Sequence, residues 1–187
     1  MMLNRRLPLF AAVSALLMAG YLLAQEMNLV KLHVDSFTIA GISTRTSNAI
    51  ESTSDARIPG MWQRFSNQNL LADIPNRVDD RVYAMYTDYE NGKDGMYTYI
   101  LGAKVSSTKN LPAQFVSHKV ASGQYAMFTE QGGPPPQMVV DLWKHIWSLE
   151  KPGGLQRAYN TDFEVHYGLA EDPAKSKVDV YVGLLGK

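Results

Sequence analysis

Two halves of the sequence match one another at a constant spacing of 81 positions, which pairs Trp62 with Trp143. The same spacing covers expected strands and an expected helix without a gap, which is typical of an internal duplication. The other matched pairs are Ile39 with Val120, Ala40 with Ala121, Val82 with Phe163, Tyr86 with Tyr167 and Gly102 with Gly183. We therefore expect repeat one at residues 30–105 and repeat two at 113–186.

Each repeat has the pattern strand, helix, strand, strand. Two such repeats paired around a pseudo-twofold axis bury more apolar surface than one repeat and leave a cleft at their junction. The expected fold class is therefore α+β, built from tandem strand–helix–strand–strand repeats. Periodicity and turn signals predict strands at 30–42, 81–89, 96–105, 114–129, 161–168 and 178–185, and helices from Pro59 and over 139–149.

The first 25 residues have the pattern of a targeting segment. Arg5 and Arg6 precede an almost wholly apolar run from Leu7 to Ala24. This order predicts a signal peptide cleaved near Ala24, and hence a periplasmic or secreted product. An uncleaved anchor in the inner membrane and a buried helix of the fold are the alternatives, because the run is close to the length of a membrane span. The sequence has no cysteine, which excludes a lipid-modified cysteine and any disulfide.

Charge and motifs exclude several function classes. Of the 18 Lys and Arg residues, two lie in the first 25 residues, and the remaining 16 compare with 18 Asp and Glu, a net charge of −2. We see no basic patch, so a nucleic-acid partner is not expected. The four histidines lack metal-ligand spacing, so no metal is expected. No glycine-rich phosphate loop follows a strand and no Gly-x-Ser-x-Gly motif occurs, so we expect no cofactor and none of the common catalytic arrangements.

The segment 161–168 contains the candidate charged residue. Its alternation places Phe163 and Val165 on one face of a strand and Glu164 on the other. A carboxylate in so apolar a segment is expected to be partly desolvated, and it is then either a structural pair or a partner for a cation. The 81-residue spacing makes Tyr83 the counterpart of Glu164, so both are expected to face the cleft.

The aromatic residues allow two interpretations. Trp143 and Trp147 lie one helical turn apart, so both are core residues or one of them reaches the cleft. The tyrosines of the first hairpin pack across strands or form walls of a binding site. These tyrosines are Tyr83, Tyr86, Tyr89 and Tyr99.

The sequence resembles the GyrI-like effector-binding superfamily, and among its branches the integron-cassette effector-binding proteins. The resemblance covers residues 30–186 and rests on the order of several short stretches. These are Tyr83 to Glu90, Tyr97 to Gly102, Gly123 to Phe128 and Asp162 to Glu164. It implies tandem repeats with a ligand cleft between them, which typically takes organic, often cationic and aromatic, small molecules. The acidic residue that matches Glu164 is a usual polar contact in that family.

Two features depart from the family. Lys104 stands in a region where many relatives have an acidic residue, and it is expected to reduce the preference for cations. The leader is also unexpected, because relatives are often fused to helix-turn-helix domains of the AraC or MerR type that act in the cytoplasm. An exported protein cannot signal to DNA directly.

We therefore expect a stand-alone, exported protein that binds small organic molecules. A hydrolase of strained or electrophilic molecules, with Glu164 as acid or water-positioning group, and a module that binds a protein partner through residues 43–58 are the alternatives. The expected ligand-binding residues are Glu164, Tyr83, Tyr99, Trp143, Trp147 and Tyr125.

Overall fold

The computed structural model describes residues 29–167 and 175–186. The expected signal segment lies outside these residues. Within them, no helix is both long and apolar enough to cross a membrane.

Eight antiparallel strands form one sheet in the order β1-β6-β8-β7-β3-β4-β2-β5. The order is symmetric about the junction of β3 and β7, because reading it backwards exchanges each strand of one repeat with its counterpart in the other. The edge strands are swapped: β1 pairs with β6 of the second repeat, and β5 pairs with β2 of the first. The strands are β1 (Val30–Val34), β2 (Phe37–Ser47), β3 (Val82–Thr87), β4 (Met96–Val105), β5 (Val116–Val120), β6 (Gly123–Gln131), β7 (Arg157–His166) and β8 (Lys177–Leu184).

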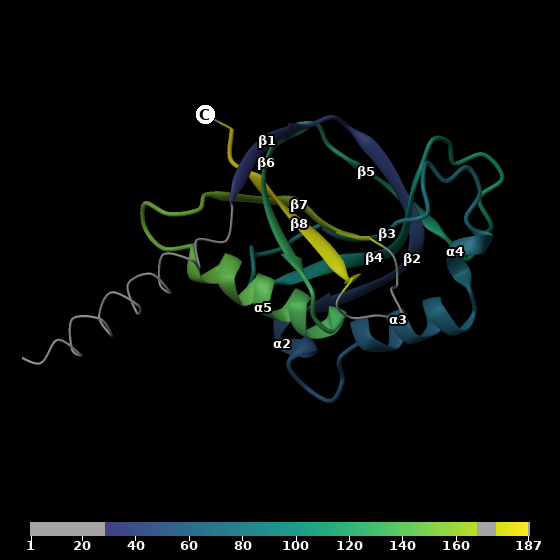
Figure 1. Ribbon diagram of the computed structural model, residues 1–187, viewed down its shortest axis with the longest axis horizontal. Coiled ribbons are helices and arrows are strands. Elements are labelled where there is room, and N and C mark those ends of the chain that lie inside the picture. The colour runs from purple at the N-terminus through teal and green to yellow at the C-terminus, as the bar shows by residue number, and fades with distance from the viewer. Residues whose placement is uncertain (1–28, 168–174, 187) are drawn as a thin grey trace, which may run out of the picture.

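Within the described residues, four helices accompany the sheet. Figure 1 shows α2, α3 and α5 along one of its sides, with β1 and β5 arching over the other. The long helix α5 begins with prolines, which suit the first turn because its N–H groups have no helical acceptor. It buries Met138, Leu142, Trp143 and Ile146 on one stripe against the sheet. The helices are α2 (Asn48–Glu51), α3 (Ile58–Asn67), α4 (Leu70–Asp73) and α5 (Pro135–Ser148).

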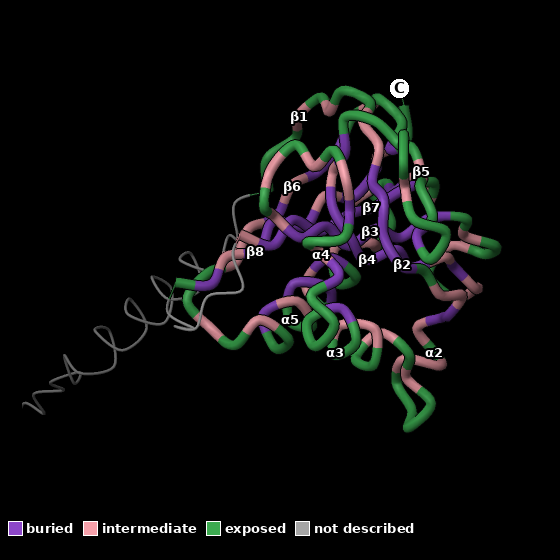
Figure 2. The backbone as a smooth tube through the Cα atoms, turned by 90° about the vertical axis from the view of Figure 1, so that its right-hand side faces the viewer, coloured by how far each residue is buried: buried purple, intermediate pink, exposed green. Residues whose placement is uncertain are grey.

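Both faces of the central strands are buried, as the tube in Figure 2 shows. The helix-covered face holds the larger cluster, which includes Tyr86, Tyr99 and Trp143. The opposite face holds a second cluster with Tyr83, Tyr125 and other residues, and the curled edges of the sheet close over it. The expected α+β fold with a symmetric pair of repeats is confirmed.

Two details of the predicted architecture are wrong. The expected strand at 30–42 is two strands, and Ile39 lies in β2 while its supposed counterpart Val120 lies in the edge strand β5. The spacing also fails between β3 and β7, where Ala84 is directly opposite Glu164. Residues directly opposite each other share a face, and a twofold axis through the sheet keeps that face. Positions of β3 and β7 that the twofold axis exchanges must therefore lie an even number of residues apart in the sequence. Tyr83 and Glu164 are 81 residues apart, an odd number, so they lie on opposite faces of the sheet.

Candidate functional site

A cavity of about 410 Å³ opens on the helix-covered face of the sheet. One side of α5 forms one wall, and the short helix α2 and the start of α3 form the other. The strands β3 and β4 supply the floor. Five of the lining residues are aromatic, and four more are apolar. The aromatic residues are Tyr86, Tyr89, Tyr97, Trp143 and Trp147, and the other apolar ones are Ile58, Pro59, Val139 and Val140.

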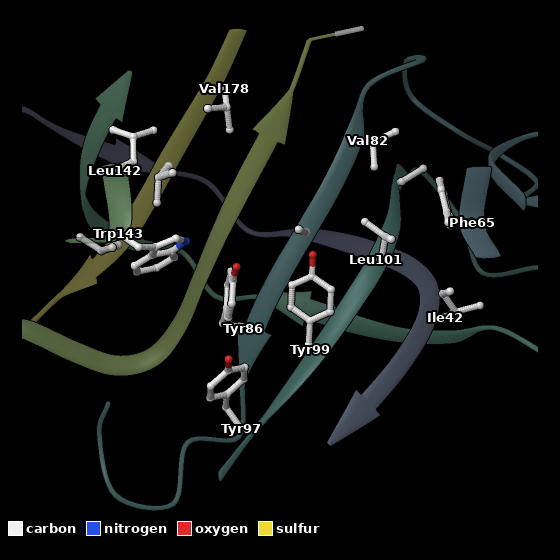
Figure 3. Packing of buried hydrophobic residues seen from close by; sticks show 14 of the residues in the cluster. Ile42, Phe65, Val82, Tyr86, Tyr97, Tyr99, Leu101, Leu142, Trp143 and Val178 are labelled. Atoms are coloured by element: carbon white, nitrogen blue, oxygen red, sulfur yellow. The ribbon is translucent and has the colours of Figure 1, made fainter. Parts of the chain in front are cut away.

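Tyr86 is the centre of this aromatic cluster, and Figure 3 shows it between Trp143 and the rings of Tyr97 and Tyr99. Its ring centroid lies 5.0 Å from Trp143, 5.1 Å from Tyr99 and 5.5 Å from Tyr97. All these rings are tilted or edge-on to Tyr86, the arrangement that aromatic quadrupoles favour. The β3–β4 register produces the arrangement, because Tyr86 is directly opposite Tyr99.

Glu164 lies immediately behind this cluster, with 1% of its surface exposed. Its Oε1 accepts hydrogen bonds from the Tyr86 hydroxyl at 2.6 Å and from the Trp143 indole nitrogen at 2.7 Å. Its Oε2 lies 2.9 Å from Nε2 of His166. Burial, and next the charge of Glu164, raise the pKa of Tyr86 well above its usual value. The phenol therefore stays protonated and acts as the hydrogen-bond donor to Glu164. The negative charge therefore reaches the cavity through two aromatic side chains that line it.

His166 links the carboxylate to the first repeat. Its ring packs 4.7 Å from the indole of Trp62 on α3. The Trp62 nitrogen in turn donates to the hydroxyl of Tyr99 at 2.9 Å. Each repeat therefore directs the indole N–H of a helical tryptophan at an acceptor on the sheet, a neutral phenol in repeat one and a carboxylate in repeat two.

A second buried carboxylate, Asp162, stands beside Glu164 on the same face of β7. It accepts from the Tyr89 hydroxyl at 2.7 Å and from Arg157 at 2.5 Å. Arg157 also donates to Glu150 at 2.7 Å, and its guanidinium packs 4.3 Å from the Tyr159 ring centroid. A register shift in β7 lies between Arg157 and Asp162, and Tyr159 within it has a φ of 50°. Of the side chains in this group, Tyr89 and Arg157 line the cavity.

The mouth of the cavity carries mixed charge. Glu51 accepts the backbone N–H groups of Arg57 and Ile58, each at 3.1 Å, and so caps the start of α3. Lys93 and Lys144 also line the cavity, and each is within 3.6 Å of a surface aspartate. Trp147 is 37% exposed at the rim.

The structure gathers four of the six predicted site residues. Glu164 and Trp143 are in direct contact, Tyr99 lies beside Tyr86 in the same cluster, and Trp147 is at the rim, 6.2 Å from Trp143 between ring centroids. Whether they contact a ligand stays a prediction.

The expectation that Tyr83 faces the same cleft as Glu164 is wrong, and Tyr125, another expected ligand-binding residue, also lies away from the cavity. Both belong to the cluster on the opposite face of the sheet. Tyr83 donates its hydroxyl to Asp79 at 3.1 Å, and Tyr125 donates to the carbonyl of Ala121 at 3.2 Å. Lys104 is also on that face, 4.7 Å from the Phe37 ring, so it does not add positive charge to the cavity.

Sequence reasoning did not select Tyr86, Tyr89 and Tyr97, although all three line the cavity. The available signal was alternation along the strands. Tyr86 is three positions from Tyr83 and so projects from the other face, whereas Tyr97 and Tyr99 share a face.

Comparison with known proteins identifies the family. Residues 32–184 match the Cass2 family, which is described as "Integron-associated effector binding protein". The chain belongs to this family. The structure is similar to the integron cassette protein VCH_CASS2 from the mobile metagenome of Vibrio cholerae, with a TM-score of 0.68 and 30% identity over 84% of this chain and 95% of that one.

One further relative agrees with this assignment, and one further structure has the same fold. The YobU protein of Bacillus subtilis (strain 168), whose name proposes a role in transcriptional regulation, is 33% identical over 81% of this chain and 94% of its own length. The structure of SAV2435 bound to tetraphenylphosphonium has a TM-score of 0.70 at 18% identity, covering 86% of this chain and 95% of that one. The family and the aromatic cavity together support the binding of a small molecule.

Proposed function

We propose that the protein is an exported binding protein for aromatic or cationic organic molecules, which it takes into the cavity in front of Glu164. The observation that carries the proposal is the contact between one buried carboxylate and two cavity-lining aromatic side chains, Tyr86 and Trp143. A carboxylate that is removed from water attracts a cation more strongly than an exposed one does.

The aromatic lining supplies the remaining interactions. A cation over the face of an indole or phenol gains about 0.5–2 kcal/mol. Two or three such contacts, together with the field of Glu164, are sufficient for micromolar binding, on the order of −8 kcal/mol. A cavity of about 410 Å³ has the size of sites that enclose drug-sized molecules.

The ligand of SAV2435 supports the same class of molecule. Tetraphenylphosphonium is a delocalised cation surrounded by aromatic rings, and it was captured in a protein of the same fold. Aromatic edges and faces of the cavity here, with a carboxylate behind them, suit a cation of that kind.

The most direct test of this function compares two molecules of equal shape and opposite charge. Calorimetric titration of the purified chain with tetraphenylphosphonium and with tetraphenylborate should give saturable binding of the cation at least tenfold tighter than that of the anion, because an unfavourable charge in a desolvated site costs more than about 1.4 kcal/mol. Equal affinity for both ions, or no binding of either, would contradict the proposal. Release of a product from an electrophilic probe would instead favour the hydrolase alternative.

Export is a separate part of the proposal. It rests on the basic and apolar pattern of residues 1–25. N-terminal sequencing of the protein from its native host should begin near Gln25, and its fractionation should place it outside the cytoplasm. A chain that begins at Met1 or Met2 in the membrane fraction would show an anchor, and one in the cytoplasm would remove export from the account.

A further inference from the structure

A second buried carboxylate, Asp162, lies beside Glu164 behind the aromatic lining of the cavity. Asp162 and Glu164 are two positions apart on one face of β7, which places them about 7 Å apart along the strand. Each of them accepts a hydrogen bond from a phenol that lines the cavity, Glu164 from Tyr86 and Asp162 from Tyr89. Two phenol–carboxylate pairs therefore lie at the cavity, and the phenol of each pair lines it.

One continuous aromatic surface joins these two pairs. The ring of Tyr97 lies 5.5 Å from Tyr86 and 5.7 Å from Tyr89, between centroids. A flat or elongated ligand that follows this surface has a carboxylate behind each of its ends.

The second pair is not neutralised within the described part of the chain. Asp162 and Glu150 share one cation, Arg157, whose side chain is 2% exposed. This triad has a net charge of −1, and its Asp162 side chain is 0% exposed. Glu164 has no lysine or arginine partner among the described residues; its ion-pair neighbour is His166. Buried, uncompensated negative charge is costly, and a cation in the cavity relieves that cost.

We infer that the cavity selects molecules with two cationic centres about 7 Å apart, and that Asp162, acting through Tyr89, sets this selectivity as a second charge-recognition residue. The inference rests on the proposed binding function and narrows its ligand class. A ligand with one cationic centre satisfies one carboxylate, whereas one with two centres satisfies both.

The test uses a pair of matched probes on the full chain. One is a bis-quinolinium dication whose charged nitrogens are separated by a short methylene chain, and the other is a mono-quinolinium with the same chain. In titrations, the dication should bind at least tenfold more tightly than the monocation, which is roughly the effect of one added charge-assisted contact. The dication should also lose more affinity than the monocation when salt is raised.

Variants identify the source of the preference. Asp162→Asn should reduce the ratio of the two affinities to near one, while the monocation changes by less than about threefold. Because that variant leaves Arg157 with one partner and could unfold, Glu150→Gln provides an independent removal of charge from the same triad and should lower the ratio in the same way. Asp73→Asn removes an exposed carboxylate at the end of α4, outside the lining of the cavity, and should keep the ratio.

The outcomes separate the two proposals. If the monocation and tetraphenylphosphonium bind but the dication is no tighter, or if both triad variants keep the ratio, the second site is refuted and the binding function stands. If no cation binds, the binding function fails and the narrower inference fails with it.

Discussion

Trp143 and Glu164 are joined by a hydrogen bond of 2.7 Å, and the indole that donates it also forms the inner wall of the cavity. The carboxylate polarises the ring through its N–H group, so the ring face that meets a ligand becomes more negative. The same indole packs 5.3 Å from the guanidinium of Arg157. Trp143 therefore couples the charged back wall to the binding surface.

Trp143→Phe keeps an aromatic face and removes the hydrogen bond. Loss of a donor to a buried carboxylate should lower the free energy of unfolding by about 1–3 kcal/mol and weaken cation binding more than the binding of a neutral aromatic molecule. Denaturant unfolding and calorimetric titration measure the two effects. The matched control is Trp147→Phe at the exposed rim, which should change stability by about 0.5 kcal/mol or less. Equal changes in the free energy of unfolding would show that the hydrogen bond is unimportant.

The buried phenol of Tyr86 predicts a loss of stability in alkaline solution. Burial and then Glu164 raise its pKa well above the usual 10.0 in the folded state. The folded protein then holds a proton that the unfolded chain releases, so this stabilisation is fully present below pH 10 and decreases as the pH rises towards the folded pKa.

Tyr86→Phe should make the alkaline loss of stability shallower by up to about 1.4 kcal/mol per pH unit above that value. Unfolding curves at several alkaline pH values give the slope. An unchanged slope in the variant would mean that the phenol titrates normally in the folded protein.

Two lysines on opposite faces of the sheet are expected to differ in their effect on ligand binding. Lys144 lines the cavity, whereas Lys104 packs on Phe37 at the opposite face. Lys144→Met should strengthen the binding of tetraphenylphosphonium by about twofold and weaken that of tetraphenylborate, as expected for an exposed charge worth up to about 1 kcal/mol. Lys104→Met should leave both affinities unchanged. An effect of Lys104 equal to that of Lys144 would contradict the assignment of the faces.

Gly102 marks a close approach between two strands. It is directly opposite Gly41 in the β2–β4 pair, and a Cβ atom at Gly102 would overlap the backbone oxygen of Ala40. Gly102→Ala must therefore displace the strands, and we expect a loss of about 1–3 kcal/mol in the free energy of unfolding, with a lower melting temperature. A control at Gly60, where a Cβ meets nothing within 4 Å, should be neutral or stabilising, because glycine is unfavourable in a helix. A Gly102→Ala protein as stable as the wild type would refute the steric account.

Local pattern predicted much of this fold and part of the site. Alternation placed Glu164 on the face opposite Phe163 and Val165, and periodicity predicted a helix over 139–149, which overlaps α5. The expected strands at 81–89 and 96–105 correspond to the paired strands β3 and β4. These features depend on neighbouring residues, which the sequence contains directly.

The errors arose where one spacing was carried across the whole repeat. The connection from α3 to β3 contains the additional helix α4, whereas α5 reaches β7 through a shorter segment. A spacing that fits the helical tryptophans therefore cannot also fit the strands, and it placed Tyr83 on the wrong face. The pairing of Asp162 with Tyr89 and Arg157 depends on a register shift in β7, for which the sequence has no local signal.

The central claim is that the buried charge of Glu164 acts on a ligand through Tyr86 and Trp143. The measurement that tests it most directly is the change in affinity for tetraphenylphosphonium on Glu164→Gln, compared with the change for the neutral triphenylphosphine oxide. Removing the charge should weaken the cation by about 1.5–3 kcal/mol, roughly 10- to 150-fold, and the neutral molecule much less. Equal weakening of both would assign Glu164 a purely structural role, and no change for either would remove it from the site.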